Sequence, residues 1–184
     1  MKTILAINGS AADGAANQQL LDYLADTSKD LFRFVFPERL KTLPPFDPAQ
    51  TLNEVPEAVN HFRNLIDTAD GVLICTPEYV FSIPSGLKNL IEWCVATTVF
   101  SEKPVALITA SASGEKAHEE LQLLFRTLQA RFRPDTTLLI PGIKGKLIAS
   151  GTPVEDSLAE RLMQLLQAFN ALIESSVTGQ FSSR

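Results

Sequence analysis

Short apolar runs alternate along this chain with longer segments whose apolar residues recur at helical spacing. Uninterrupted apolar runs are typical of buried strands, and a spacing of three or four residues is typical of amphipathic helices. The runs predict strands over residues 3–7, 33–36, 71–75, 104–109 and 137–140. The spacing predicts helices over residues 17–25, 53–67, the stretch after Pro84, 115–132, and a last helix opened by a capping box at Thr152–Glu155.

Strand and helix signals alternate from one end of the chain to the other, so the predicted fold class is α/β, with a parallel sheet covered on both faces. A flavodoxin-like strand order of 2-1-3-4-5 and a Rossmann order both satisfy this pattern. We expect one domain over residues 1–174 and a loose polar tail over residues 175–184. The connection over residues 37–53 is long and proline-rich, which favours either a lid or partner-facing flap or a proline-stiffened excursion.

The composition is that of a soluble globular domain, with 184 residues, 45% hydrophobic residues and a formal charge of −5. A net negative chain argues against nonspecific nucleic-acid binding. No apolar run approaches the ~18 residues of a membrane helix, and none is typical of a signal peptide, so we expect a cytoplasmic protein. Cys75 and Cys94 are expected to be buried free thiols, and His61 and His118 surface histidines without a metal site.

Three loops follow the first, third and fourth predicted strands, over residues 9–16, 77–83 and 110–114. The carboxyl ends of parallel strands share one edge of a sheet, so these loops are expected to converge where ligands bind in open α/β folds. Each loop opens a helix, whose N–H groups suit a phosphate. The first loop lacks the Lys and Ser/Thr of a Walker A motif, and no G-x-G-x-x-G occurs. A monophosphate beside a flat-ring platform remains, which is the shape of flavin mononucleotide (FMN).

Several short motifs carry a resemblance that covers essentially the whole chain. They are Leu43-Pro44-Pro45-Phe46-Asp47, Pro77-Glu78-Tyr79, Ser82-Ile83-Pro84, Leu87-Lys88-Asn89 and Glu92-Trp93. With them the chain resembles the NADPH-dependent FMN reductases, which include azoreductases and quinone or chromate reductases. The resemblance implies a three-layer αβα sandwich with the flavodoxin-like strand order and a homodimer or homotetramer. It also implies NADPH or NADH as co-substrate and a small acceptor such as a flavin, quinone, azo compound or metal oxyanion.

The resemblance also implies which residues bind FMN, while the flavin itself carries the chemistry and no catalytic side chain is needed. Backbone N–H groups near Tyr79, Val80 and Phe81 are expected to contact the edge of the flavin ring. The full set of predicted cofactor-binding residues is Ser10, Asn17, Pro77, Glu78, Tyr79, Val80, Phe81, Ser82, Ser111, Ser113 and Gly114.

The chain departs from the family's usual pattern in the phosphate loop. Ala12 and Ala15 stand where the family has Arg and Ser, and Val80 stands where it has Asn. Losing a charge-assisted contact to phosphate costs roughly 1.5–3 kcal/mol, so FMN is expected to bind more weakly. The alternatives are a non-enzymatic flavodoxin-like scaffold or redox-sensing partner that has lost flavin, and a flavodoxin-type electron carrier.

Four further side chains can be interpreted from their positions in the sequence. Lys88 and Glu92 are spaced to form an i,i+4 ion pair on one helix. Trp93 suits either a subunit interface or the core. Glu78 suits an interface ion pair, an exposed loop carboxylate or, least of all, a catalytic acid.

Overall fold

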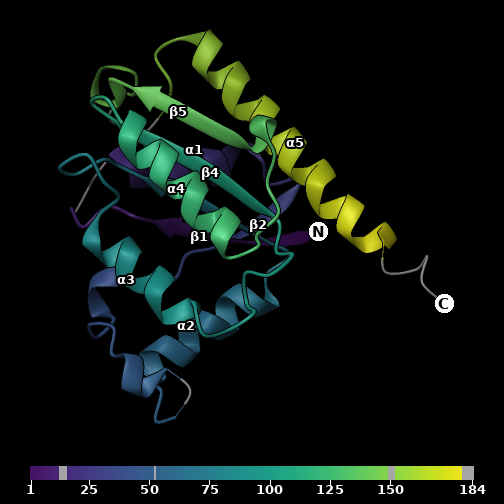
Figure 1. Ribbon diagram of the computed structural model, residues 1–184. Helices are drawn as coiled ribbons and strands as arrows, with labels where there is room; N and C mark the ends of the chain where they lie inside the picture. The colour runs from purple at the N-terminus through teal and green to yellow at the C-terminus, as the bar shows by residue number, and fades with distance from the viewer. Residues whose placement is uncertain (13–15, 52, 149–151, 180–184) are drawn as a thin grey trace.

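The computed structural model describes residues 1–12, 16–51, 53–148 and 152–179, and its centre is a parallel sheet of five strands (Figure 1). The order is β2-β1-β3-β4-β5, which confirms the flavodoxin-like arrangement and excludes the Rossmann one. The register pairs Leu5 with Val72, Cys75 with Ile108, and Ile108 with Leu138. The strands are β1 (Lys2–Asn8), β2 (Phe32–Val35), β3 (Gly71–Thr76), β4 (Val105–Ser111) and β5 (Thr137–Pro141).

Helices cover both faces of the sheet and complete the three layers (Figure 1). Side chains alternate across a strand, so Val72 and Ile74 join one apolar cluster while Leu73 and Cys75 join the other. The first cluster lies under α2, α3 and α4, and the second lies under α1 and α5. The helices are α1 (Ala16–Thr27), α2 (Glu57–Thr68), α3 (Ser85–Cys94), α4 (Glu115–Thr127) and α5 (Asp156–Gly179).

Three predicted helix ends were wrong. Helix α2 begins at Glu57 rather than at residue 53, because Pro56 has an extended ψ of 141° and serves as the N-cap. Helix α4 ends at Thr127 rather than at residue 132, because the chain reverses through Gln129, whose φ is 58°. The capping box at Thr152 does not open α5. The Thr152 carbonyl instead accepts the Ile148 N–H at 2.9 Å, and the helix begins at Asp156.

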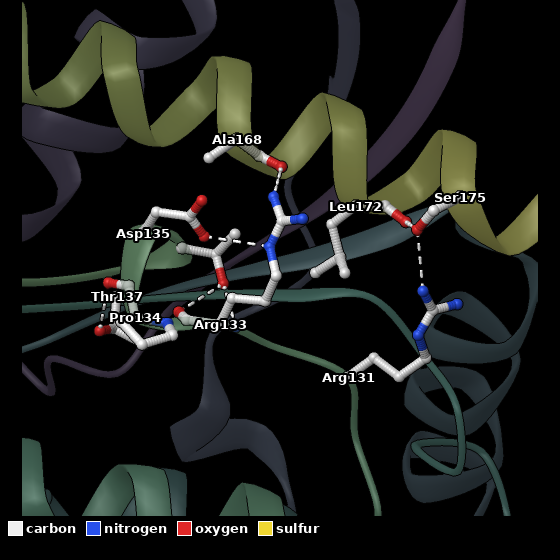
Figure 2. A network of polar contacts seen from close by, with 9 residues as sticks. Arg131, Arg133, Pro134, Asp135, Thr137, Ala168, Leu172 and Ser175 are labelled. Carbon is white, nitrogen blue, oxygen red and sulfur yellow. Dashed lines mark hydrogen bonds and ion pairs between the residues drawn. The ribbon is translucent and has the colours of Figure 1, made fainter.

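Helix α5 continues into the segment predicted to be a loose tail. It runs to Gly179, so residues 175–179 are helical, while residues 180–184 lie outside the described part of the chain. Figure 2 shows two arginines from the segment before β5 reaching this helix. Arg131 donates to the Ser175 hydroxyl at 2.9 Å, and Arg133 donates to the Ala168 carbonyl at 3.1 Å. The contact at Ala168 lies before the predicted boundary, and the contact at Ser175 lies at the first residue after it.

The long connection after β2 is held to helix α3 by a network around one carbonyl. The Pro44 carbonyl accepts from Asn89 Nδ2 and from Trp93 Nε1, both at 2.9 Å. Asn89 Oδ1 in turn accepts the Phe46 N–H at 2.7 Å. Trp93 is fully buried and packs edge-on against the Phe46 ring, so in this chain it is a core residue.

A buried guanidinium holds the far end of the same connection. Arg63 on α2 donates to the Trp93 carbonyl and, at 3.2 Å, to the Thr51 carbonyl. The connection also contains two short 3₁₀ helices, η1 (Leu40–Thr42) and η2 (Pro48–Gln50). Of the two interpretations left open by the sequence, these contacts favour the stiffened excursion over the lid.

Candidate functional site

A cleft of about 820 Å³ opens at the carboxyl edge of the sheet. Its walls come from Ser10, Ala12 and the start of α1, from Pro77 and Tyr79, and from residues 110–112. The loops after β1, β3 and β4 therefore converge as the parallel topology predicts. Most of the side chains that line this cleft are small, so a flat ligand can approach the backbone closely.

Where the loop after β1 begins, its backbone passes close to the backbone of β3. Gly9 N–H donates to the Cys75 carbonyl at 2.8 Å, and a Cβ on Gly9 would lie 2.4 Å from Thr76 Oγ1. Ser10 follows, with its N–H bound to Asn8 Oδ1 at 2.9 Å and its hydroxyl 3.2 Å from the Tyr79 hydroxyl. Ser10 and Tyr79 thus join two walls of the cleft.

Asn17 lies at the floor of the cleft with its amide turned into the protein. It is 3% exposed, and its Nδ2 donates to the Ala110 carbonyl at 3.2 Å and to Cys75 Sγ at 3.4 Å. Burial raises the pKa of the Cys75 thiol to about 12, so this sulfur stays protonated at neutral pH. Both cysteines are buried free thiols, as predicted. In this structure Asn17 ties α1 to the neighbouring strands.

Glu78 caps helix α4, a role that none of the three interpretations from sequence included. Its carboxylate accepts the Gly114 N–H at 3.3 Å and the Ala117 N–H at 3.0 Å, and its own N–H donates to Ser111 Oγ at 3.1 Å. Gly114 has a φ of 96°, which glycine adopts without strain. A carboxylate at a helix N-terminus is favoured by the unpaired N–H groups and the helix dipole. The end of α4 is therefore already occupied by this carboxylate.

Residues 79–82 form a two-residue hairpin turn at the mouth of the cleft. The N–H of Tyr79 donates to the Ser82 carbonyl at 2.9 Å, and the N–H of Ser82 donates back to the Tyr79 carbonyl at 3.1 Å. The central residues Val80 and Phe81 have φ of 51° and 59° and are 93% and 78% exposed. Positive φ at both positions is the geometry of a type I′ turn, which normally selects Asn and Gly. Here it presents two apolar side chains outward.

Glu120 on α4 anchors the far side of this hairpin. Its Oε2 accepts from the Ser82 hydroxyl at 2.7 Å and from the Ile83 N–H at 2.9 Å. Lys88 Nζ lies 3.7 Å from Glu120 Oε1. Lys88 thus pairs across to α4, and the predicted pair with Glu92 was wrong because the facing carboxylate comes from another helix.

A fourth wall of the cleft comes from the loop after β5, which sequence reasoning missed. Residues 142–145 and Leu147 form this wall. Lys144, on the 3₁₀ helix η4 (Ile143–Gly145), adds a positive charge to it. The Gly142 N–H donates to the Ala112 carbonyl at 3.1 Å, which joins this loop to the loop after β4. The signal was present, because Pro141-Gly142 directly follows the fifth predicted strand at the same edge of the sheet.

A smaller hollow of about 150 Å³ lies beside the main cleft and shares Ser10 with it. Residues from the loop after β1, from the start of η1 and from the start of α3 line it, and two of them are cations, Arg39 and Lys41. Arg39 is half-buried, and its Nη2 donates to the Ala12 carbonyl at 3.1 Å.

The two histidines differ in their surroundings. His61 is exposed on α2, as predicted. His118 is half-buried, and its Nδ1 lies 2.9 Å from the Thr109 hydroxyl, so the prediction of a surface histidine was wrong for it. Burial lowers the pKa of His118 below its ordinary value. Within the described ranges no three His, Cys, Asp or Glu side chains gather as a metal site would require, and no helix is both long and apolar enough to cross a membrane.

The predicted site residues thus divide into two groups. Ser10, Asn17, Pro77, Tyr79 and Ser111 line the cleft. The others belong to the scaffold around it, where Glu78 and Gly114 bind each other, Ser82 binds Glu120, and Ser113 is exposed without lining the cleft. Val80 and Phe81 form the exposed turn at its mouth.

Comparison with known proteins shows which family this chain is similar to. Residues 2–145 match the family of NADPH-dependent FMN reductases. The chain is 29% identical over 191 residues to the NADH:(hydroxy)cinnamate reductase subunit CrdA of Vibrio ruber, covering 98% of this chain and 91% of that protein. It is 34% identical over 148 residues to the NADH-dependent flavin reductase subunit 2 of Lactobacillus johnsonii, covering 74% and 78% of the two chains.

A solved structure shares the fold over nearly the whole chain. FerB, a flavoenzyme NAD(P)H:(acceptor) oxidoreductase from Paracoccus denitrificans, superposes with a TM-score of 0.76 at 21% identity. The superposition covers 95% of this chain and 98% of that one. At this identity the likeness concerns the fold.

Proposed function

Because the chain belongs to the NADPH-dependent FMN reductase family, we propose that it binds FMN in the main cleft and uses it to reduce a small acceptor with NAD(P)H. The observation that carries this proposal is the cleft itself. Its 820 Å³ falls in the ~300–1,000 Å³ range of small-molecule sites, and it lies at the carboxyl edge of the strands. Ala12, Ala16, Ala110 and Ala112 line it with side chains small enough for a flat ring to lie against the backbone.

The residues present fit the two ends of such a cofactor. The hydroxyls of Ser10 and Tyr79 and the backbone of the loop after β1 offer polar groups for the phosphate end. Pro77, Ala110 and Ala112 offer apolar walls for the ring end. Glu78 and Glu120 hold the loop after β3 in place against α4, so this wall is preorganised before any ligand arrives.

Bound FMN would supply the redox chemistry, in which NAD(P)H and one proton reduce an acceptor such as a quinone by two electrons, leaving NAD(P)⁺ and the quinol. The chain's own part is to bind FMN, to orient it and to shield it. We propose a flavin, quinone, azo compound or metal oxyanion as the acceptor class, and a homodimer or homotetramer as the working form. Analytical ultracentrifugation tests the oligomeric state separately from the activity.

The first experiment is a titration of FMN with the purified chain, followed by quenching of flavin fluorescence. Binding at micromolar concentration, followed by oxidation of NADPH or NADH in the presence of a quinone, supports the proposal. An absence of binding at about 100 μM, roughly −5.5 kcal/mol, would overturn it and favour the non-enzymatic scaffold.

Two matched variants locate the binding. Ala112 and Ser113 are neighbouring exposed residues, and only Ala112 lines the cleft. Ala112→Trp is expected to block the ring end and abolish FMN binding, while Ser113→Trp leaves it within about twofold. Equal binding by the two variants would place the flavin elsewhere.

A further inference from the structure

We propose that Lys144, on the loop after β5, binds a carboxylate carried by the acceptor, so that this protein prefers acidic quinones to neutral ones. This inference rests on the proposed function and names the substrate class of the same cleft. Lys144 lies outside every motif that carries the family resemblance, and only the fold brings it to the cleft.

The charge of Lys144 is available to a ligand. The side chain is exposed and lines the cleft, and no carboxylate of the described residues pairs with it. Every other described residue that lines the cleft is uncharged. An ammonium group has three N–H donors and no acceptor, so an anion satisfies it best.

Lys144 lies on the side of the cleft where an acceptor would meet the flavin ring. In the sheet, β3 and β4 separate β5 from β1, and each step between strands is about 4.8 Å. The loop after β5 is joined instead to the proposed ring end, because the Gly142 N–H donates to the Ala112 carbonyl at 3.1 Å. The cation therefore belongs with the ring walls rather than with the hydroxyls of Ser10 and Tyr79.

The surroundings of this cation favour an organic acceptor over a small inorganic anion. Ile143, Leu147 and Ala112 line the same part of the cleft with apolar side chains. A quinone ring can bury its apolar surface against them while its acidic group reaches the ammonium. A small oxyanion would use the charge and leave this apolar surface exposed to water.

The backbone that carries Lys144 is held before any ligand binds. The preceding residue, Ile143, is 4% exposed and belongs to the apolar cluster under α1 and α5. The turn is closed by the Gly145 N–H, which donates to the Gly142 carbonyl at 3.1 Å, and by the Lys146 N–H, which donates to the Ile143 carbonyl at 3.0 Å. Binding therefore has to order only the lysine side chain.

The test compares anthraquinone-2-carboxylate with anthraquinone-2-carboxamide, which has nearly the same shape and no charge. Each is titrated into the FMN-loaded chain without NADPH, so that no reduction occurs, and calorimetry gives the dissociation constants. Lys144→Gln should weaken binding of the carboxylate by about 5- to 10-fold and leave binding of the carboxamide within about twofold. Lys144→Arg keeps the charge and should keep the preference.

The matched control is Lys146→Gln. It removes the same charge two positions along the chain, from a side chain that does not line the cleft, and should change neither affinity. Added salt should reduce the preference of the unaltered chain for the carboxylate, because an exposed charge is screened, and should have little effect on Lys144→Gln. Equal losses in Lys144→Gln and Lys146→Gln would show a general effect of net charge and overturn the assignment.

Two other anions define further outcomes that would overturn the proposal. If Lys144→Gln weakens binding of FMN but not of riboflavin, which lacks the phosphate, the lysine binds the flavin phosphate. If the variant raises the KM for NADPH and leaves the affinity for both quinones unchanged, the lysine binds the nicotinamide cofactor.

Failure of this inference and failure of the proposed function give different results. If the unaltered chain binds FMN and then binds the carboxylate and the carboxamide equally well, the flavin site stands and the role of Lys144 falls. If the chain binds no FMN, both proposals fall together.

Discussion

The hydroxyl of Ser82 donates a 2.7 Å hydrogen bond to the carboxylate of Glu120, a residue 38 positions further along the chain. The same carboxylate oxygen accepts the N–H of Ile83, whose side chain is buried in the core. One acidic side chain on α4 thus fixes the base of the turn that presents Val80 and Phe81. The loop beside the cleft is held by α4 at both ends, since Glu78 binds the first turn of the same helix.

Removing this anchor should destabilise the fold. Glu120→Ala leaves the Ile83 N–H and the Ser82 hydroxyl without their acceptor, and we expect the free energy of unfolding to fall by about 1–3 kcal/mol. Urea unfolding measures this change in the free energy of unfolding. The control is Glu119→Ala on the same helix, where an exposed carboxylate pairs with Lys116 at 2.8 Å. An equal loss in both variants would show that Glu120 contributes no more than surface charge.

Relieving the strain in the turn should stabilise the protein. Val80 is a β-branched residue at a φ of 51°, where side chains of this shape are disfavoured. Val80→Asn is expected to raise the free energy of unfolding by about 1 kcal/mol, because Asn tolerates this region and little buried surface is lost. Val95→Asn changes an exposed valine with an ordinary φ of −59° and should give no gain. Thermal unfolding of both variants distinguishes strain relief from a general effect of polarity.

The close approach at the start of the loop after β1 should tolerate no side chain. In Gly9→Ala the new Cβ would lie 2.4 Å from Oγ1 of the fully buried Thr76, so we expect a loss of about 1–3 kcal/mol in unfolding free energy. Gly145→Ala adds the same methyl group where nothing lies within 4 Å. That variant should be neutral or slightly more stable, and similar losses at both sites would contradict the packing argument.

Stability should depend on pH through His118. Burial lowers the pKa of His118 from its ordinary 6.5, so the unfolded chain binds this proton more readily than the folded one. The stabilisation is therefore complete above pH 6.5 and is lost as the pH falls through the lower folded pKa. Chemical unfolding at several pH values should show this decline, and His118→Asn should reduce it. His61→Asn, at an exposed position, serves as the control and should leave the profile unchanged.

Much of the fold could be predicted because its signals are local. Runs such as residues 71–75 need no partner to be recognised as buried strands, and parallel topology then brings the following loops to one edge. The side-chain contacts of the site could not be predicted in this way. Whether Glu78 caps a helix, or Asn17 faces the interior, depends on residues more than 30 positions away that sequence patterns do not place. The place of the loop after β5 could have been predicted, because Pro141-Gly142 follows the fifth predicted strand at the same edge of the sheet.

The bonds that hold Asn89 have a consequence for how related chains are found. Asn89, Trp93 and Glu78 belong to the motifs that carry the family resemblance, and here each side chain binds one structural element to another. A search that weights these letters therefore retrieves proteins by their architecture, whether or not they retain a ligand. Whether a chain of this architecture binds a ligand depends instead on the residues that line its cleft, such as Ala12.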